Sequence, residues 1–192
     1  MGFGGIDQNS DGGGTEPSSM SAETGAIHQR FEEALSALDV ALTRTTPTAF
    51  ESTLQEIVTD PVVGTPLPFE DVALPEWVDD EPTPATLEAA TTGVTAASMG
   101  IADYGTVVLP STPEGAEQVS LFPDLHVPVL RASDLVPDMP TAIDRLGPQL
   151  REGTSAILAT GPSATADMGA LVKGAHGPKE VHVVVVEVGD DE

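Results

Sequence analysis

The chain has 192 residues, no cysteine and a formal net charge of −24, which is set by 31 acidic and seven basic residues. Without cysteine it has no disulfide, no thiolate metal site and no iron–sulfur cluster of its own, and without a basic stripe it is not expected to bind nucleic acid. No apolar run reaches the roughly 18 residues of a membrane span, and the N-terminus lacks the basic and apolar regions of a signal peptide.

The acidic residues are spread along the whole chain, and Lys173 and Lys179 are its only lysines. Such a surface repels itself at low ionic strength and keeps a protein soluble in concentrated salt. We therefore expect a cytoplasmic protein of a salt-accumulating halophile. An acidic protein from a non-halophilic organism is the alternative, and the scarcity of lysine argues against it.

The N-terminal part of the chain is predicted to be a tail followed by a helix. Residues 1–20 are rich in glycine and serine, which is typical of a disordered acidic and glycine-rich tail. From Ser21 to about Thr45, apolar side chains recur at the spacing of one helix face. These side chains are Ile27, Phe31, Leu35, Leu38 and Leu42.

A second helix is predicted to open at Thr46 and Pro47, which suit the N-cap and the first helical position. Residues 21–60 thus read as a helical segment packed on the rest of the chain. Pro61–Pro84 is rich in proline and acidic residues and is predicted to be an irregular loop. Trp77, the only tryptophan, is expected to pin this loop onto the body, with stacking on a ligand as the alternative.

Residues 91–109 are predicted to form two strands, joined by a short helix or turn and by an Asp-Tyr-Gly turn. Within that turn, Asp103 beside Gly105 is either a turn former or a ligand-facing acid. The segment His126–Leu130 reads as a short strand. Pro128 cannot donate to a strand ladder, so we place this strand at a sheet edge or a strand end.

The C-terminal part is predicted to be a helix over residues 139–150, a strand over 155–159 and a polar Gly161–Ser163 turn that leads into a short helix. The last strand covers residues 181–188. Its run Val183–Val186 does not alternate, which indicates a central strand buried on both faces.

Strands that alternate with helical patterns predict an α/β fold, with a mostly parallel sheet covered by helices on both faces. We expect a single α/β domain over residues 61–192, with residues 21–60 packed on it.

Ligand contacts are predicted from loops that should converge at the carboxyl end of the sheet, where open α/β sheets bind ligands. These contacts are Gly93, Thr95, Asp103, Gly105, Thr106, Gly161, Pro162, Ser163, Thr165, Asp167, His176, Gly177 and Lys179. Among them, His176, Asp167 and Asp103 are the candidates for acid–base catalysis. No metal site is predicted, because one histidine and two aspartates from separate loops are not a metal signature.

Several of these residues have a structural alternative. The turn before the predicted helix would offer backbone N–H groups and the Ser163 hydroxyl to a carboxylate or phosphate, or Ser163 would only cap the helix. His176 is either an acid or base or a hydrogen-bonded turn residue. Lys179 either offsets local acidity for an anion or lies free on the surface. His182 is expected to be packed or bonded in the core.

Three segments, in this order and spacing, resemble the LUD (lactate utilisation) domain family, LutC type. The segments are Gly93–Leu109, then Val119–Pro123 with the His126 strand and Asp134–Pro137, and finally Gly161–Met168 with Gly174–Pro178. The chain departs from the family pattern at Ser98, at Tyr104 and at Ala164, which stands where many members have arginine. The missing arginine puts in doubt a mechanism that needs a guanidinium clamp at this turn.

The resemblance implies a fold similar to the NagB/RpiA/CoA-transferase group and a role in oxidising L-lactate to pyruvate. It also implies iron–sulfur partner proteins of the LutA and LutB type, while this cysteine-free chain would carry no cluster and no covalently bound cofactor. One hypothesis is therefore an accessory subunit with a small-anion pocket. A second is an enzyme acting on a CoA, acyl or phosphorylated substrate, and a third is an interaction or regulatory domain with a vestigial pocket.

Overall fold

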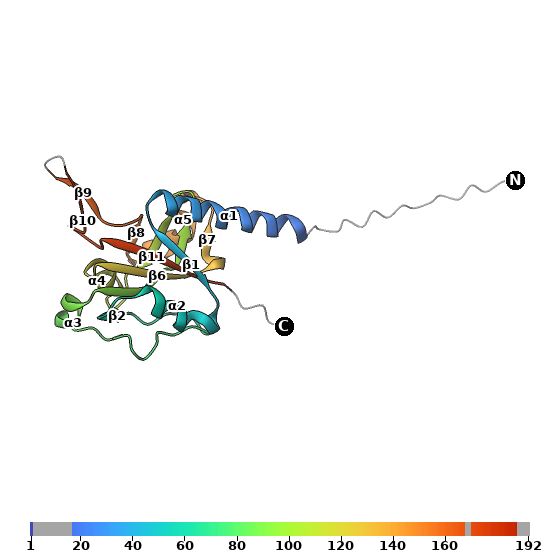
Figure 1. Ribbon diagram of the computed structural model, residues 1–192. Coiled ribbons are helices and arrows are strands. Elements are labelled where there is room, and N and C mark those ends of the chain that lie inside the picture. The colour runs from blue at the N-terminus through green and yellow to red at the C-terminus, as the bar shows by residue number, and fades with distance from the viewer. Residues whose placement is uncertain (2–16, 168–169, 188–192) are drawn as a thin grey trace.

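The computed structural model describes residues 1, 17–167 and 170–187. Most of the predicted tail, residues 2–16, lies outside the described residues, and the first helix, α1, covers Pro17–Ala37 (Figure 1). Within the described ranges, no helix is both long enough and apolar enough to cross a membrane.

A five-stranded parallel sheet forms the centre of the molecule and confirms the predicted α/β fold. Its strand order is β1-β11-β6-β3-β2, and every pair of neighbours is parallel. The strands are β1 (Ala41–Thr45), β11 (Glu180–Val186), β6 (Leu125–Arg131), β3 (Thr92–Ala96) and β2 (Val62–Gly64).

A second sheet of four short strands packs beside the first, and the sequence did not predict it. Its order is β7-β4-β5-β8, and all its pairs except β4–β7 are antiparallel. The strands are β7 (Leu135–Val136), β4 (Met99–Ile101), β5 (Thr106–Pro110) and β8 (Ala156–Ala159). Of the short helix or turn expected between β3 and β5, the helix is wrong, because the chain bends at Ser98 and then forms β4.

Helices cover the two sheets from outside, so the molecule is built in layers (Figure 1). The helix α2 (Phe50–Ile57) and the proline-rich loop pack on one face of the central sheet. The other face of that sheet packs against α1 and the second sheet. The outer face of the second sheet is covered by α5 (Met139–Arg151). Two short helices, α3 (Pro84–Ala89) and α4 (Ala116–Leu121), and two single 3-10 turns, Pro47–Ala49 and Ala132–Asp134, complete these layers.

The strand β11 is buried on both faces, as its unbroken valine run predicts. Val183 and Val185 point into the apolar cluster between the two sheets. Val184 and Val186 point into the opposite cluster beneath α2. Each of these side chains is fully buried, and full burial of such a side chain stabilises a fold by roughly 1.5–3 kcal/mol.

The predicted edge position of the Pro128 strand is wrong, because β6 is the middle strand of the central sheet. Its pairing with β3 runs without a gap through Pro128. Its pairing with β11 is interrupted, since Val181 pairs with His126 and the next pair is Val184 with Val129. The sheet thus accommodates the missing proline donor by a local gap in one ladder.

The single helix predicted from Ser21 to Thr45 is also wrong in its second part. The helix α1 ends at Ala37, and the chain turns at Asp39, whose φ is +61°. It then runs back as β1, whose β-branched threonines favour a strand. Leu42 still packs against the cluster that contains the α1 side chains, so the apolar spacing reflected a shared core rather than one helix.

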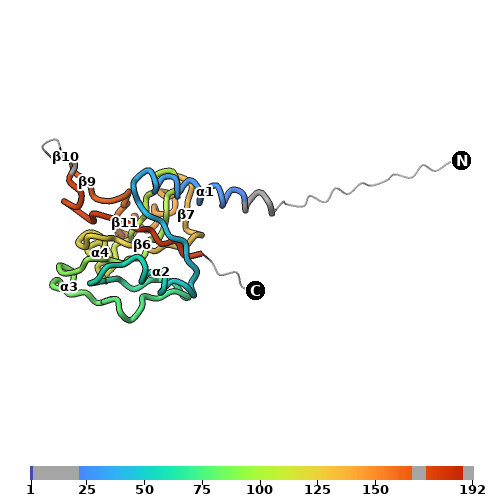
Figure 2. The backbone as a smooth tube through the Cα atoms, in the orientation of Figure 1, coloured from blue at the N-terminus to red at the C-terminus, as the bar shows by residue number. Residues whose placement is uncertain are grey.

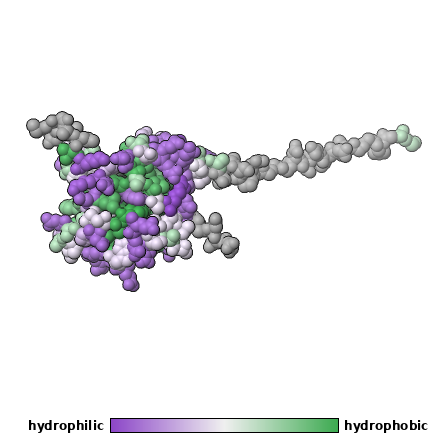
Figure 3. Space-filling view, in the orientation of Figure 1, coloured by the Kyte–Doolittle hydropathy of each residue, from purple (hydrophilic) through white to green (hydrophobic). Residues whose placement is uncertain are grey.

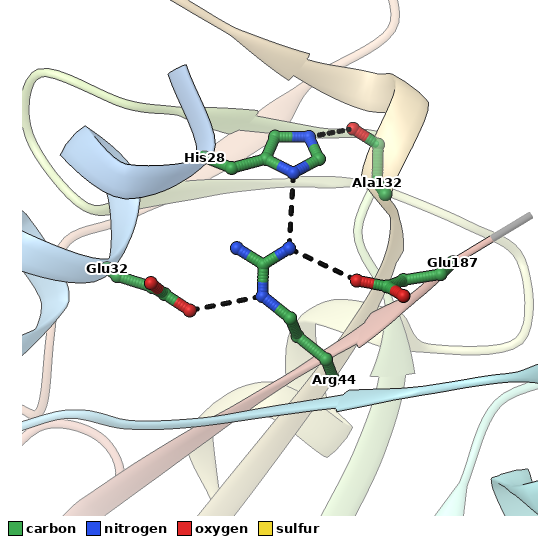
Figure 4. A network of polar contacts seen from close by, with 5 residues as sticks. All are labelled: His28, Glu32, Arg44, Ala132 and Glu187. Carbon is green, nitrogen blue, oxygen red and sulfur yellow. Dashed lines mark hydrogen bonds and ion pairs between the residues drawn. The ribbon is translucent and has the colours of Figure 1, made fainter. Parts of the chain in front are cut away.

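A polar network centred on Arg44 ties α1 to the edge of the central sheet (Figure 4). The Arg44 guanidinium donates to Glu32 on α1 and to Glu187 after β11, each at 3.1 Å. It also donates to His28 Nδ1 at 3.2 Å, so His28 carries its proton on Nε2, which lies 3.2 Å from the carbonyl oxygen of Ala132. The network joins the N-terminal helical segment to the rest of the fold.

The proline-rich loop is held to the body mainly by backbone bonds and buried valines. Gly64 N–H donates to the Asp79 carbonyl at 2.9 Å, and Val72 and Val78 are buried under the central sheet. Trp77, which the sequence suggested as the anchor, remains 36% exposed and contributes one hydrogen bond to Glu51.

Candidate functional site

Of the strand, turn and short helix predicted around Gly161, the strand β8 and the turn are present, but the helix is wrong because the residues after the turn form a strand. The chain continues instead as a hairpin of β9 (Ala164–Asp167) and β10 (Ala170–Lys173) that projects from the body (Figure 2). The Ser163 N–H donates to the Pro178 carbonyl, and the Gly174 N–H donates to the Ser163 carbonyl, both at 2.9 Å. Ser163 is therefore not a helix cap, and its backbone N–H is already used.

The turns on either side of the hairpin lie at the amino end of the central sheet, not at its carboxyl end. The segment Gly174–Lys179 leads directly into β11, whose first residue is Glu180. Gly161 and Gly174 have φ values of +75° and +79°, which glycine adopts without strain. The turns lie at this end because β8 belongs to the second sheet, where it runs antiparallel to β5, so the turn that follows β8 lies near the start of the parallel strands.

A small pocket of about 160 Å3 lies beneath these turns and between the two sheets; we call it the amino-end pocket. Four of the predicted ligand residues line it, namely Gly161, Ser163, His176 and Gly177. The other lining residues are Leu109, Ser120, Leu121, His126, Ile157, Ala159, Pro178 and Val181. The two turns lie together, as the sequence predicted, but at the amino end of the sheet rather than at its carboxyl end.

His126 is the buried polar residue of the amino-end pocket, and sequence reasoning missed it. It points from the middle strand β6, is 1% exposed, and lies with Nε2 2.9 Å from the Thr95 hydroxyl oxygen. Burial lowers the pKa of His126 from 6.5 to about 3, so its imidazole is neutral at physiological pH. A histidine inside an otherwise apolar strand was the sequence signal that could have identified His126. Thr95 was predicted as a ligand contact, but its hydrogen-bond partner His126 was not.

The polar groups of the pocket run from a buried interior to an exposed mouth. His126 is fully buried, Ser163 is half-buried and His176 is exposed. The Ser120 hydroxyl donates to the Glu117 carbonyl at 2.7 Å and is thereby occupied. Aliphatic side chains form the remaining walls, so the pocket can hold a small, partly apolar molecule that makes a few directed hydrogen bonds.

Other predicted residues lie outside the amino-end pocket. Asp103 forms an ion pair with Arg30 on α1 at 3.0 Å. Gly105 lies against the backbone of α1, and Thr106 Oγ1 is 2.7 Å from Thr160 Oγ1. Gly93 packs directly under Val119 of α4.

The predicted residues Lys179, Pro162 and Thr165, near the hairpin, also lie outside the lining of the amino-end pocket. Lys179 is exposed and forms an ion pair with Asp124 at 2.8 Å. Pro162 and Thr165 are half-buried, and Thr165 lies in β9, where it pairs with Val172. The side chain of Asp167 lies outside the described part of the structure. His182 is half-buried beside Thr43, with Nε2 2.8 Å from its hydroxyl oxygen, and burial lowers its pKa.

A larger pocket of about 540 Å3 lies at the opposite end of the central sheet; we call it the carboxyl-end pocket. It is lined by residues at or just after the carboxyl ends of β2, β3 and β6, including Thr65, Ser98 and Arg131. The Arg131 guanidinium forms an ion pair with Asp71 and lies 4.9 Å from the centre of the Phe69 ring. Asp134 also lines this pocket, and burial raises its pKa while Arg145 and Arg131 oppose that effect.

No group of three or more histidine, aspartate or glutamate side chains within the described ranges could hold a metal ion.

The sheets and pockets define a two-sheet α/β protein, and comparison with solved structures agrees with that class. A crystal structure of a DUF162 family protein from Deinococcus radiodurans superposes with a TM-score of 0.65. The match covers 85% of this chain and 98% of the other at 21% sequence identity, so it supports the fold alone.

The LUD domain model matches residues 48–186, and the chain therefore belongs to the LUD domain family. It is 31% identical over 126 residues to a lactate utilization protein C from Deinococcus radiodurans, covering 64% of this chain and 59% of that protein. It is 33% identical over 127 residues to one from Bacillus velezensis, covering 62% and 53% respectively. The chain thus spans little more than half the length of these relatives. The predicted family resemblance is confirmed.

Proposed function

We propose that this protein acts in L-lactate utilisation as an accessory subunit that works with iron–sulfur partner proteins of the LutA and LutB type. Membership of the LUD family and the names of the relatives support the pathway. The absence of cysteine supports a subunit whose redox centres reside in its partners. Its own contribution is to hold a small anion.

The amino-end pocket is the proposed binding site for this small anion. Four residues predicted to contact a ligand gather around it together with His126. Its volume of about 160 Å3 suits a molecule of a few heavy atoms and falls below the roughly 300–1,000 Å3 of pockets for larger ligands. Ser163 and His176 near its mouth supply polar contacts for a carboxylate.

The carboxyl-end pocket favours a second candidate function, an enzyme or binding protein for a larger acyl or phosphorylated substrate. With about 540 Å3 it has room for such a ligand. Its arginine is already paired with Asp71 and stacked on Phe69, so an incoming anion would have to compete for that guanidinium. This competition makes the amino-end pocket the better-supported anion site.

Binding measurements separate the two candidates. We would titrate the protein with L-lactate, pyruvate and CoA by calorimetry in concentrated KCl. The proposal predicts binding of a small acid that weakens about tenfold in Ser163→Ala, the expected loss for one hydrogen bond to a charged group. Ser133→Ala, which removes an exposed hydroxyl far from the pocket, is the matched control and should bind like the wild type. Binding of CoA alone would favour the carboxyl-end candidate.

Partner binding is tested with defined proteins. The LutA- and LutB-type proteins of the same organism would be purified, mixed with this protein and separated by size-exclusion chromatography. The proposal predicts a shared peak, and it predicts that deletion of the gene abolishes growth on L-lactate. Separate peaks together with unchanged growth on L-lactate would contradict the accessory-subunit role.

A further inference from the structure

The imidazole of His126 has one ring nitrogen without a hydrogen-bond partner among the residues that the structure describes. Its Nε2 lies 2.9 Å from the Thr95 hydroxyl oxygen. Its Nδ1 has no hydrogen bond to any residue that the structure describes. No fully buried side-chain nitrogen or oxygen in the described ranges lacks a partner, so Nδ1 is reached from the amino-end pocket that His126 lines. A polar atom that faces a pocket in this way is available to a bound molecule.

The contact with Thr95 determines which nitrogen carries the proton. The Thr95 hydroxyl has no acceptor other than His126 within the described residues, and Thr95 is fully buried. If Nε2 carried the proton, the hydroxyl hydrogen would be buried without an acceptor, which is costly. The favourable arrangement has the hydroxyl donating to Nε2, and the imidazole proton then resides on Nδ1, facing the pocket.

We propose that His126 is a specificity-determining residue of the amino-end pocket, where its Nδ1–H donates to an uncharged oxygen of the ligand while the ligand's anionic group stays at the mouth. The ligand class is a short acid with a ketone or hydroxyl oxygen next to its carboxylate. This inference deepens the proposed function and rests on it for the small-anion pocket, but not for the partners or the pathway.

The gradient of burial supports this orientation of the ligand. A carboxylate placed against the neutral His126 would lose its hydration and gain one neutral donor, which is unfavourable. At the mouth it meets the half-buried Ser163 and the exposed His176, and it keeps its contact with water. Leu109 and Ile157 provide apolar walls for the short carbon chain. Because burial lowers the pKa of His126 to about 3, the donor stays neutral throughout the physiological range.

The first test measures the proton position in the ligand-free protein. A long-range 1H–15N correlation spectrum in concentrated KCl, assigned by comparison with His126→Phe, should show Nδ1 protonated and Nε2 unprotonated. In Thr95→Val, which removes the hydroxyl donor, this preference should be lost although the histidine remains. A wild-type spectrum with the proton on Nε2 overturns the inference whatever the ligand is.

The second test compares four acids that differ at the carbon next to the carboxylate: pyruvate, L-lactate, propionate and alanine. Pyruvate and lactate should bind about tenfold more tightly than propionate, which lacks the inner oxygen, and alanine should bind most weakly because its ammonium faces a donor. His126→Phe should remove the preference of pyruvate over propionate. Thr95→Val, which keeps the size of the side chain, should reduce that preference in parallel with the change in the spectrum.

These outcomes also separate the inference from the proposed function. Equal binding of pyruvate and propionate overturns the role of His126 and leaves the small-anion pocket intact. No binding by any of the four acids overturns the small-anion pocket and this inference together. The predicted spectrum and binding order, combined with separate peaks for the iron–sulfur partners and unchanged growth on L-lactate, support the inference and contradict only the accessory-subunit role.

Discussion

Gly93 marks the closest approach between the central sheet and α4. A Cβ atom at this position would overlap the carbonyl oxygen of Val119, a backbone atom that cannot move aside as a flexible side chain can. We therefore expect Gly93→Ala to lower the free energy of unfolding by roughly 1–3 kcal/mol, the usual cost of overpacking. Chemical denaturation measures this loss.

The matched control for that prediction is Gly25→Ala. Gly25 lies exposed within α1, and nothing lies within 4 Å of its added Cβ. Because alanine favours a helix over glycine, this change should raise stability by about 0.5–1 kcal/mol. A Gly93→Ala variant as stable as the wild type would contradict the described packing of α4.

His126 makes the stability of the fold depend on pH. Its pKa is about 3 in the folded protein and 6.5 in its unperturbed state. Below pH 6.5 the unfolded chain therefore binds a proton that the folded protein does not. Above pH 6.5 both states are unprotonated at this residue, and His126 does not reduce the free energy of unfolding. As the pH decreases from 6.5 toward 3, the free energy of unfolding falls by up to about 1.4 kcal/mol per pH unit.

The measurement is chemical denaturation from about pH 7.5 to about pH 5, where most carboxylates are still ionised. In His126→Gln the free energy of unfolding should fall less steeply with decreasing pH than in the wild type. His176→Gln, the same substitution at an exposed position, is the control variant. Equal slopes for wild type and His126→Gln would contradict a neutral, buried imidazole. His182, whose pKa is shifted in the same direction, is present in all three proteins.

At the residue scale, the sequence located turns better than it located contacts. Gly161, Ser163, His176 and Gly177 gather around one pocket as predicted. The sequence allowed Asp103 to be either a turn residue or a ligand contact. In the structure it forms an ion pair with Arg30, a residue 73 positions away in the sequence. His126 was missed because its role depends on Thr95 in a neighbouring strand, and strand pairing across a sheet is not encoded in local spacing.

At the element scale, α5 carries a proline in its interior that the helix tolerates at a cost. Pro148 lies in the last turns of Met139–Arg151, where its ring removes a backbone donor and crowds the carbonyl of Asp144. Pro148 is exposed, so replacing it removes little packing. We expect Pro148→Ala to raise the melting temperature, with a stabilisation of up to about 3 kcal/mol.

Pro140 provides the comparison within the same helix. It lies in the first turn of α5, where the N–H groups have no intrahelical partner. Pro140→Ala should therefore change stability by less than about 0.5 kcal/mol. If both substitutions had the same effect on thermal unfolding, the backbone argument for Pro148 would be wrong.

The elements that the sequence predicted well are those whose burial is complete or whose boundaries are marked by proline. The valine run of β11 and the helix α5 are examples. The elements it missed depend on partners: β4 forms a strand by pairing with β5 and β7. The stretch Ala164–Asp167 forms a strand only by pairing with β10. The strand β6 could be central because a gap in one ladder accommodates Pro128.

At the scale of the whole molecule, the net charge of −24 predicts a stability that depends on salt. The face in Figure 3 is largely hydrophilic around a central apolar area. Six ion pairs are present among the described residues, and the seven basic residues of the chain can neutralise only a minority of its 31 acidic residues. Mutual repulsion of the remaining carboxylates should oppose folding when it is not screened.

We expect the melting temperature, followed by circular dichroism, to rise steeply between about 0.1 M and about 3 M KCl. Sucrose, which strengthens burial without screening charge, is the control and should not reproduce the full effect. Full stability at about 0.1 M salt would contradict the halophilic interpretation.

The fold class and the family could be predicted at this scale, whereas the arrangement of two sheets could not. Alternating strands and helices indicate a parallel α/β sheet, and the ordered motifs indicate the LUD family. The second sheet determines at which end of the central sheet the candidate site lies. It places β8 against β5, and this brings the turn after β8 to the amino end of the central sheet. That placement follows from long-range pairing.

The central claim is that the amino-end pocket binds a small acid, and blocking the pocket tests it most directly. Ala159 lines the pocket, and a leucine there would fill much of its volume of about 160 Å3. Pyruvate and L-lactate would be titrated by calorimetry in concentrated KCl against wild type, Ala159→Leu and the exposed control Ala85→Leu. We expect only Ala159→Leu to lose binding, while its circular dichroism spectrum stays that of the wild type. Undiminished binding in folded Ala159→Leu would place the ligand elsewhere and contradict binding in the amino-end pocket.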